Sequence, residues 1–168
     1  QSKLSVTMPA NDGKAMIANT VSLLKSSDIL KIPVLLTEQY PKGLGPTDSV
    51  IVDNLPATAQ IFAKTGFSCC LAEGFNQALE KHARRQIILV GQESHVCILQ
   101  TAVELLQLGY QVHVLEDAVC SRKPEHKFYA LKRMQQQGVI ISNYESVLFE
   151  CLRDANHPNF KTISNFLR

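Results

Sequence analysis

The sequence has no tryptophan, no long apolar segment and no C-x-x-C cysteine pair. A helix needs roughly 18 consecutive apolar residues to cross a bilayer, and no run in the chain approaches that length, which argues against a membrane span. The five cysteines are an odd number in a domain of ordinary size, so neither a disulfide scaffold nor a zinc knuckle is expected. This cysteine usage is typical of a reducing compartment, the cytoplasm or the mitochondrion.

The sequence also lacks a strong charge of one sign. Lys and Arg number 17 against 15 Asp and Glu, which gives a net charge of +2, and the basic residues are scattered along the chain. Proteins that bind nucleic acid usually carry a stronger and clustered positive charge, so nucleic acid is not an expected partner. Hydrophobic residues make up 45% of the 168, which is enough for a core and favours one domain over residues 1–168.

Segments with the apolar pattern of buried strands alternate with segments that have a helical apolar period. Strands are expected at 32–37, 61–63, 86–91, 111–116 and 139–142. Helices are expected from residue 11, then at 72–83, 99–108, 125–136 and 146–152, and finally after Pro158. The order predicts an α/β fold, a single doubly wound parallel sheet with helices on both faces. The site of such a fold lies beyond the carboxyl ends of its strands.

Cys97 is the candidate nucleophile, because its segment joins the clearest strand to the clearest helix. We expect Ser94 to cap that helix, which places Cys97 in the first helical turn. Free backbone N–H groups and the helix dipole stabilise a thiolate there, and the same N–H groups can hold an oxyanion. The alternative is that Cys97 is a small buried packing residue, as free cysteines usually are.

Other candidates also follow strand ends. Lys64 is placed to lower a thiol pKa or to pair with a carboxylate, unless it is a solvated surface lysine. His95 has the position of a structural or loop histidine. Glu38 and Asp117 could serve the site, although loop carboxylates more often accept hydrogen bonds from nearby backbone N–H groups. The five histidines show no metal-ligand spacing and no glycine loop precedes a helix, so no metal and no cofactor are predicted.

Three segments of the chain, residues 37–45, 63–68 and 91–101, together resemble the isochorismatase-like cysteine hydrolases. The resemblance continues through residues 117–122 and 156–161 and so covers essentially the whole chain. It implies a three-layer α/β fold and a cofactor-free hydrolase with an Asp–Lys–Cys trio. Cys97 matches the nucleophile of that trio and Lys64 matches its lysine.

The resemblance places the aspartate of the trio outside the sequence. In the family it ends the first strand in an Asp-x-Gln pattern, and Gln1 matches the glutamine of that pattern. The chain also opens without a methionine, so we expect the aspartate and its strand just before Gln1. The resemblance further implies that the N–H groups of Glu93 and Cys97 hold the oxyanion. Glu93 would be presented by a cis peptide bond with Gln92, and His95 would lie at the substrate.

The resemblance also bears on the substrate. Nicotinamidases of the family carry an Asp-x-His metal pattern where this chain has Glu38-Gln39-Tyr40, so nicotinamide is not an expected substrate. We expect instead a small amide or a related small molecule. The alternatives are a non-catalytic binding or scaffold protein, and a mitochondrial-associated ribonuclease, the label of some kinetoplastid members. The ribonuclease is the weaker alternative, because the sequence shows no obvious pair of catalytic histidines.

A homo-oligomer, a dimer or larger, is also expected. Relatives commonly associate, and the last helix carries Phe160, Ile163 and Leu167 on one apolar stripe. The alternative is that this stripe docks on the chain's own domain.

Overall fold

The computed structural model describes residues 1–167, apart from the side chain of Ser2. The strands are β1 (Leu35–Gln39), β2 (Gln60–Lys64), β3 (Gln86–Gln92), β4 (Gln111–Cys120) and β5 (Ile140–Ser142). The α-helices are α1 (Ser2–Ser5), α2 (Ala10–Leu30), α3 (Pro41–Leu44), α4 (Ser49–Val52), α5 (Phe75–His82), α6 (Leu99–Gln107), α7 (Pro124–Gln136), α8 (Tyr144–Leu152) and α9 (Phe160–Ser164). The shorter turns are η1 (Cys69–Leu71), η2 (Ser94–Ile98) and η3 (Asn165–Leu167).

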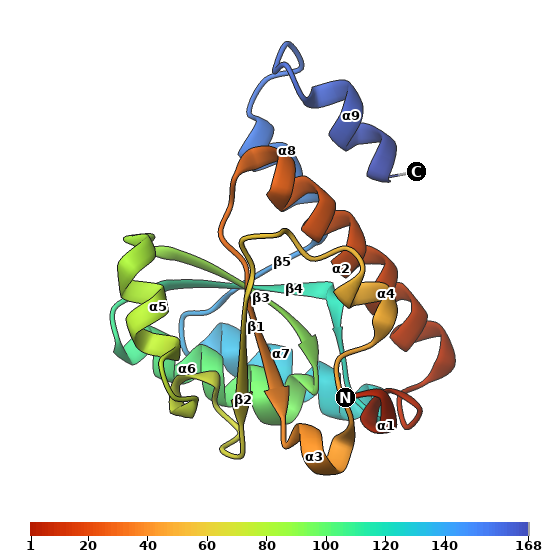
Figure 1. The fold of residues 1–168 in the computed structure, drawn as a ribbon, viewed down its shortest axis with the longest axis vertical. Helices are drawn as coiled ribbons and strands as arrows, with labels where there is room; N and C mark the ends of the chain where they lie inside the picture. Colours follow the sequence, from red (N-terminus) through yellow and green to blue (C-terminus); the bar gives the residue numbers. More distant parts are fainter. Residues whose placement is uncertain (168) are drawn as a thin grey trace.

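All paired strands run parallel, and helices cover both sides of them. β1 pairs with β2, and β4 lies between β3 and β5. Figure 1 shows α2 and α8 on one side of β3, β4 and β5, with α6 and α7 on the other side. The predicted α/β fold with parallel strands is therefore confirmed. The carboxyl ends of the strands meet at one edge, where a site is expected.

The strands form two sheets, whereas the sequence predicted one continuous sheet. Between β1 and β3 lies a cavity of about 220 Å³, lined by Val34 to Thr37 on one side and Ile88 to Gln92 on the other. Successive side chains of a strand point to opposite faces of its sheet, so a cavity on one face would contact every second residue. This cavity is lined by consecutive residues, and it therefore lies along the edges of β1 and β3. The two sheets are separate because no described strand lies in this gap to bridge them.

The main core lies between β4 and the helices α6 and α7. Leu105, Val114 and Met134 have no exposed surface, and Val112 is 1% exposed. Their burial follows from the sequence pattern, since apolar residues recur at helical spacing on α6 and on alternate positions of β4. The core fixes β4 against α6, which extends the turn that carries Cys97.

The apolar stripe of the last helix packs on the chain's own domain. Ile163 is fully buried against Leu148 and Leu152 of α8, and Phe160 and Leu167 pack on the same cluster. Side chains of α2 complete that cluster. The stripe therefore docks on the chain's own domain, which was the alternative to an oligomer interface, and it gives no support to self-association.

Two strand boundaries differ from the prediction. β4 continues past Glu116 to Cys120 because Val119 and Cys120 are buried and pair with Gly91 and Gln92 after a shift in register. β1 begins at Leu35, later than predicted, because the end of α2 extends its hydrogen bonding to Ile32, whose N–H donates to the Ser27 carbonyl at 2.9 Å. The longer β4 brings its carboxyl end beside the Cys97 turn.

Candidate functional site

Cys97 lies in η2, the wide turn between β3 and α6. The N–H of Ile98 donates to the Glu93 carbonyl at 3.2 Å, which spans five residues and gives the turn its π-helical width. The prediction that Ser94 caps this helix is wrong. Glu93 holds the cap position, and the Ser94 hydroxyl donates to the Cys120 carbonyl at 3.0 Å. The extended end of β4 offers that carbonyl to Ser94, so the hydroxyl is directed across to β4.

Lys64 and Cys97 come together at the carboxyl edge. Lys64 Nζ lies 3.5 Å from Cys97 Sγ. The lysine is 6% exposed, so the alternative of a solvated surface lysine is wrong. Its ammonium also donates to the side-chain oxygen of Gln39 and to the carbonyls of Gly66 and Phe67, at 3.1 and 2.8 Å for the carbonyls. These acceptors compensate the buried charge and fix the ammonium beside the sulfur.

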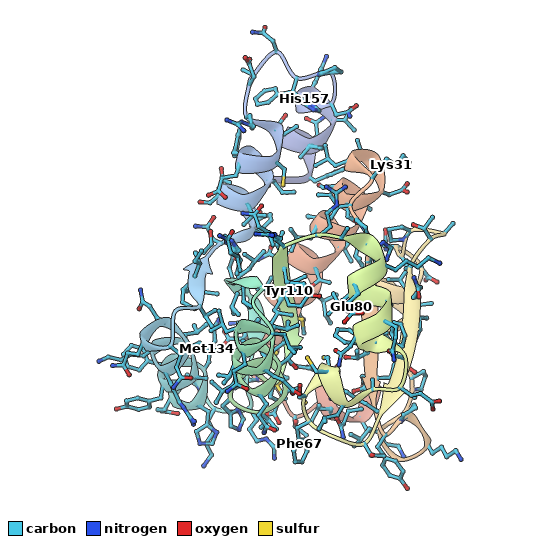
Figure 2. The ribbon with its side chains drawn as sticks, turned by 90° about the vertical axis from the view of Figure 1, so that its left-hand side faces the viewer. Lys31, Phe67, Glu80, Tyr110, Met134 and His157 are labelled. Carbon is cyan, nitrogen blue, oxygen red and sulfur yellow. The ribbon has the colours of Figure 1, made fainter. Side chains whose placement is uncertain are left out.

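The two sides of this arrangement come from different sheets. Gln39 ends β1 and pairs in register with Lys64 at the end of β2, whereas Cys97 follows β3. Gln39 Oε1 lies 4.0 Å from Cys97 Sγ as well as beside Lys64. Figure 2 shows Phe67, which accepts from Lys64, at the end of the molecule opposite His157. The candidate site therefore lies far from the C-terminal helices.

Burial raises the pKa of the Cys97 thiol above its ordinary value, while the Lys64 ammonium acts in the opposite direction. The predicted thiolate-stabilising environment is therefore only partly present in the structure. Loss of water around the sulfur disfavours the charged form more than the neighbouring lysine favours it. The balance of the two effects favours the protonated thiol over the thiolate.

The turn before Cys97 carries a buried carboxylate. Glu93 is 4% exposed, and its oxygens accept from Arg122 Nε at 2.9 Å and Arg122 Nη2 at 2.6 Å. The hydrogen bonds from Arg122 hold the pKa of Glu93 below its ordinary value. The peptide bond between Gln92 and Glu93 is cis. The sequence alone assigned no role to Arg122. The residue was included only because it lies in segment 117–122, which resembles the isochorismatase-like hydrolases.

His95 lies beside a second histidine. Its Nδ1 is 3.0 Å from the Ser121 hydroxyl, and its ring centroid is 4.5 Å from that of His126. Burial lowers the pKa of His95, and the charges of His126 and Arg122 lower it further, whereas Glu93 raises it. The sequence showed no histidine pair because His126 belongs to α7, which packs against η2 in space.

Glu38 and Asp117 accept hydrogen bonds from backbone N–H groups. Glu38 Oε1 accepts from the N–H and the hydroxyl of Thr47, both at 2.7 Å, and Asp117 Oδ1 accepts from the Tyr144 N–H at 3.0 Å. Thr37 and Cys69, which sequence reasoning left out of the site, line the same cavity as Cys97, with Thr37 Oγ1 3.2 Å from Cys69 Sγ.

Within residues 1–167, no group of three or more His, Cys, Asp or Glu side chains is arranged to hold a metal ion. No helix in this part of the chain has the length and apolar character that crossing a membrane requires. The five cysteines are all free thiols.

Comparisons with known proteins agree with this arrangement. The sequence profile of the isochorismatase domain matches residues 4–146. Isochorismatase family protein 1B of Dictyostelium discoideum is 41% identical over 144 residues, which cover 84% of this chain and 70% of that protein. Isochorismatase domain-containing protein 1 of Salmo salar is 41% identical over 146 residues, 87% of this chain. The match covers 51% of the salmon protein, so the chain spans about half its length.

Solved structures share the fold. A structure described as the MAR1 ribonuclease from Caenorhabditis elegans has a TM-score of 0.93 and 36% identity, over 99% of this chain and 84% of that one. The YcaC gene product of Escherichia coli, described as an octameric hydrolase of unknown specificity, is similar in fold alone, with a TM-score of 0.85 and 22% identity over 98% of this chain and 88% of that one. Together with the profile match, these likenesses show that the chain belongs to the isochorismatase family.

Proposed function

We propose that the chain is a cofactor-free cysteine hydrolase of small amides or related substrates, with Cys97 as its nucleophile. The observation that carries the proposal is the partly buried contact between Lys64 Nζ and Cys97 Sγ, 3.5 Å apart at the carboxyl edge of the strands. A nucleophilic thiolate needs a nearby positive charge, and a lysine held by three further acceptors supplies one at a fixed place.

A base completes the proposed site. Because burial raises the pKa of Cys97 and so favours the neutral thiol, a group that removes its proton would assist the attack. We assign this role to the aspartate expected just before Gln1. It takes the proton from Sγ as the sulfur bonds to the substrate carbonyl carbon. The base then gives the proton to the leaving amine, and water hydrolyses the resulting thioester with the base acting again.

The gap between β1 and β3 supports a strand that carries this base. The gap exposes the edges of two parallel strands, and a strand added there would extend both hydrogen-bond ladders. Gln1 lies at the carboxyl end of this gap, with its Nε2 donating to the Gln39 carbonyl at 2.9 Å. A strand that leads into Gln1 and runs parallel to β1 would therefore end beside Lys64 and Cys97.

The backbone N–H groups of Glu93 and Cys97 are the proposed oxyanion donors. Cys97 lies within the turn η2, and Glu93, whose backbone is extended, directly precedes that turn. A tetrahedral intermediate develops negative charge on the former carbonyl oxygen, and two N–H donors aimed at that oxygen stabilise it. His95, two residues before Cys97, is the proposed side chain at the substrate.

Cys97→Ala in the full-length protein tests the proposal. The unsubstituted protein is first assayed on a panel of small amides, and any amide it hydrolyses is then given to the variant. We expect Cys97→Ala to abolish turnover and leave the circular dichroism spectrum unchanged. Cys151→Ala, an exposed cysteine on α8, is the matched control and should keep full activity. Equal turnover by Cys97→Ala would refute the nucleophile.

A non-catalytic binding or scaffold protein is the competing proposal. It predicts that the natural protein carries no aspartate ahead of Gln1 and that the panel shows no turnover. An aspartate two residues before Gln1, together with turnover that depends on Cys97, would exclude it.

A ribonuclease is a second candidate function, favoured by the description of the C. elegans structure and by the pairing of His95 with His126. The geometry gives it less support, because rings with centroids 4.5 Å apart leave no space for a phosphodiester between them. RNA binding that weakens steeply with salt, and cleavage lost in His95→Ala but kept in Cys97→Ala, would establish it. We expect neither.

Self-association is also proposed. The E. coli YcaC gene product is described as octameric, and α7 of this chain exposes two neighbouring aromatic side chains, Phe128 at 59% and Tyr129 at 67%. Light scattering at micromolar concentration should give a multiple of the monomer mass. Replacing both aromatics with serine should reduce it, whereas a monomer mass for the unsubstituted protein would contradict the proposal.

A further inference from the structure

Three consecutive side chains of the turn before Cys97 are all bonded to one short segment. The Glu93 carboxylate accepts from Arg122, the Ser94 hydroxyl donates to the Cys120 carbonyl, and His95 Nδ1 lies 3.0 Å from the Ser121 hydroxyl. The segment 120–122 is the end of β4 and the start of the loop that follows it. The turn is thus attached to β4 through its side chains as well as through the strand ladder.

Arg122 makes the most constrained of these attachments. Its Nε donates to Glu93 Oε1 at 2.9 Å and its Nη2 donates to Oε2 at 2.6 Å, so the two planar groups meet as a fork. The backbone N–H of Arg122 also donates to Oε1, at 3.2 Å. A bidentate pair fixes the direction of the carboxylate as well as its distance, which a single hydrogen bond does not.

The burial of Glu93 shows which partner holds the other in place. Glu93 is 4% exposed, whereas the side chain of Arg122 is 52% exposed. A buried carboxylate requires compensation for its charge, and the guanidinium supplies it from the surface side. Without the guanidinium, the Glu93 carboxylate would keep only the backbone N–H of residue 122 among these donors, and the turn would lose the fork that fixes its direction.

We propose that Arg122 is a positioning residue for the oxyanion-binding turn, acting through the Glu93 carboxylate. This inference rests on the proposed function, in which the backbone N–H of Glu93 binds the oxyanion. The residue that supplies the donor is then the residue whose side chain Arg122 holds. A donor must lie about 2.7–3.1 Å from the oxyanion, so a small displacement of Glu93 removes much of its effect.

Two reactions of Cys97 separate positioning from general damage to the site. Acylation by p-nitrophenyl acetate passes through a tetrahedral oxyanion and needs the donors. Alkylation by iodoacetamide is a direct displacement of iodide by sulfur, forms no oxyanion, and depends only on the thiolate and its access. A residue that positions the donors should affect the first reaction and not the second.

The experiment compares Arg122→Gln and Arg122→Lys with the unsubstituted full-length protein. We expect acylation of Cys97 to slow by about tenfold to a hundredfold in Arg122→Gln, somewhat less than direct loss of a donor. Arg122→Lys keeps the charge but loses the fork, so it should recover only part of the rate. Alkylation should stay within about twofold in both variants, since neither changes Lys64 or the sulfur.

Lys123→Gln is the matched control, because it removes one positive charge from the next, exposed position. It should leave both reactions unchanged. In Arg122→Ala, millimolar guanidinium ion should restore part of the acylation rate by occupying the place of the side chain. Thermal melting of each variant shows whether it is folded under the assay conditions.

The remaining outcomes overturn the inference in distinguishable ways. Acylation at the normal rate in Arg122→Gln would show that the turn holds its donors without Arg122. Equal slowing of acylation and alkylation would show that the ion pair is structural only. A raised KM for the ester at unchanged kcat would make Arg122 a substrate contact. Failure of the unsubstituted protein to acylate at Cys97 would instead refute the proposed function itself.

Discussion

Lys64 Nζ lies 3.5 Å from Cys97 Sγ, although the two residues belong to different sheets. The contact forms because β2, which is parallel to β1, and β3, which is parallel to β4, end at the same edge of the fold. Residues at and just after these strand ends converge there. Lys64 is the charge that opposes the effect of burial on the thiol. The contact between Lys64 and Cys97 therefore depends on the ends of two separate sheets remaining aligned.

Lys64→Met should make Cys97 less reactive. The Lys64 ammonium acts to lower the pKa of the thiol, so its removal moves that pKa further upward. The measurement is the rate of iodoacetamide alkylation from about pH 6 to pH 10, followed by mass spectrometry. Lys42→Met, an exposed lysine of α3, serves as the control. An unchanged midpoint in Lys64→Met would show that Lys64 does not act on the sulfur.

Glu93→Gln should destabilise the protein at neutral pH more than at acid pH. Arg122 lowers the pKa of Glu93 in the folded protein. The ion pair is therefore fully stabilising above the pKa that this carboxyl has in the unfolded chain, about 4.3, and its contribution is lost as pH falls through the lower folded value. Urea denaturation at pH 7 and near pH 3 measures the difference. Glu80→Gln, on the exposed face of α5, should show no such dependence.

Local patterns predicted which segments become strands and helices, and long-range contacts decided the rest. Cys97 and Lys64 could be singled out because each lies at or shortly after the end of a strand, a property that short-range apolar patterning reveals. Arg122 and His126 could not be singled out in this way, because the residues they contact lie in other elements. Contacts with Glu93 and His95 arise only after β4 has extended to Cys120 and α7 has packed against η2.

The division into two sheets was also beyond local patterning. The apolar run of β1 and that of β3 are typical of strands buried on both faces. Neither run indicates which strand lies beside it, because pairing depends on the whole order of the sheet. The same limit explains the last helix, whose stripe around Ile163 could dock on its own domain or on another copy.

Leu105→Ala should lower the free energy of unfolding by about 2.5–5 kcal/mol, because a fully buried leucine leaves a cavity when it is truncated. Leu108, at the end of the same helix, is 54% exposed and provides the matched control. Leu108→Ala should change stability by no more than about 0.5 kcal/mol. Urea denaturation of both variants is the measurement. Similar losses at the two positions would contradict the core described between β4 and α6.

Gly66→Ala should change the position of the Lys64 ammonium indirectly, by moving the loop whose carbonyls accept its hydrogen bonds. A Cβ on Gly66 would lie 2.7 Å from Leu71 Cδ1 and 2.9 Å from Leu71 Cβ. The exposed end of Leu71 can rotate away, but its Cβ moves only with the backbone, so the loop must shift. The carbonyls of Gly66 and Phe67 both accept from Lys64, and a shift of the loop weakens this hold on the ammonium.

The expected result is slower alkylation of Cys97 in Gly66→Ala, in the same direction as in Lys64→Met but smaller, since the charge itself remains. Gly13→Ala is the control for the added methyl group. Its Cβ meets only Met8 Cβ at 3.4 Å, and alanine favours the helix α2, so stability should be equal or up to about 1 kcal/mol higher. Normal alkylation in Gly66→Ala would show that the ammonium keeps its place without these carbonyls. In that case the side chain of Gln39 alone would suffice to hold Lys64 against the sulfur.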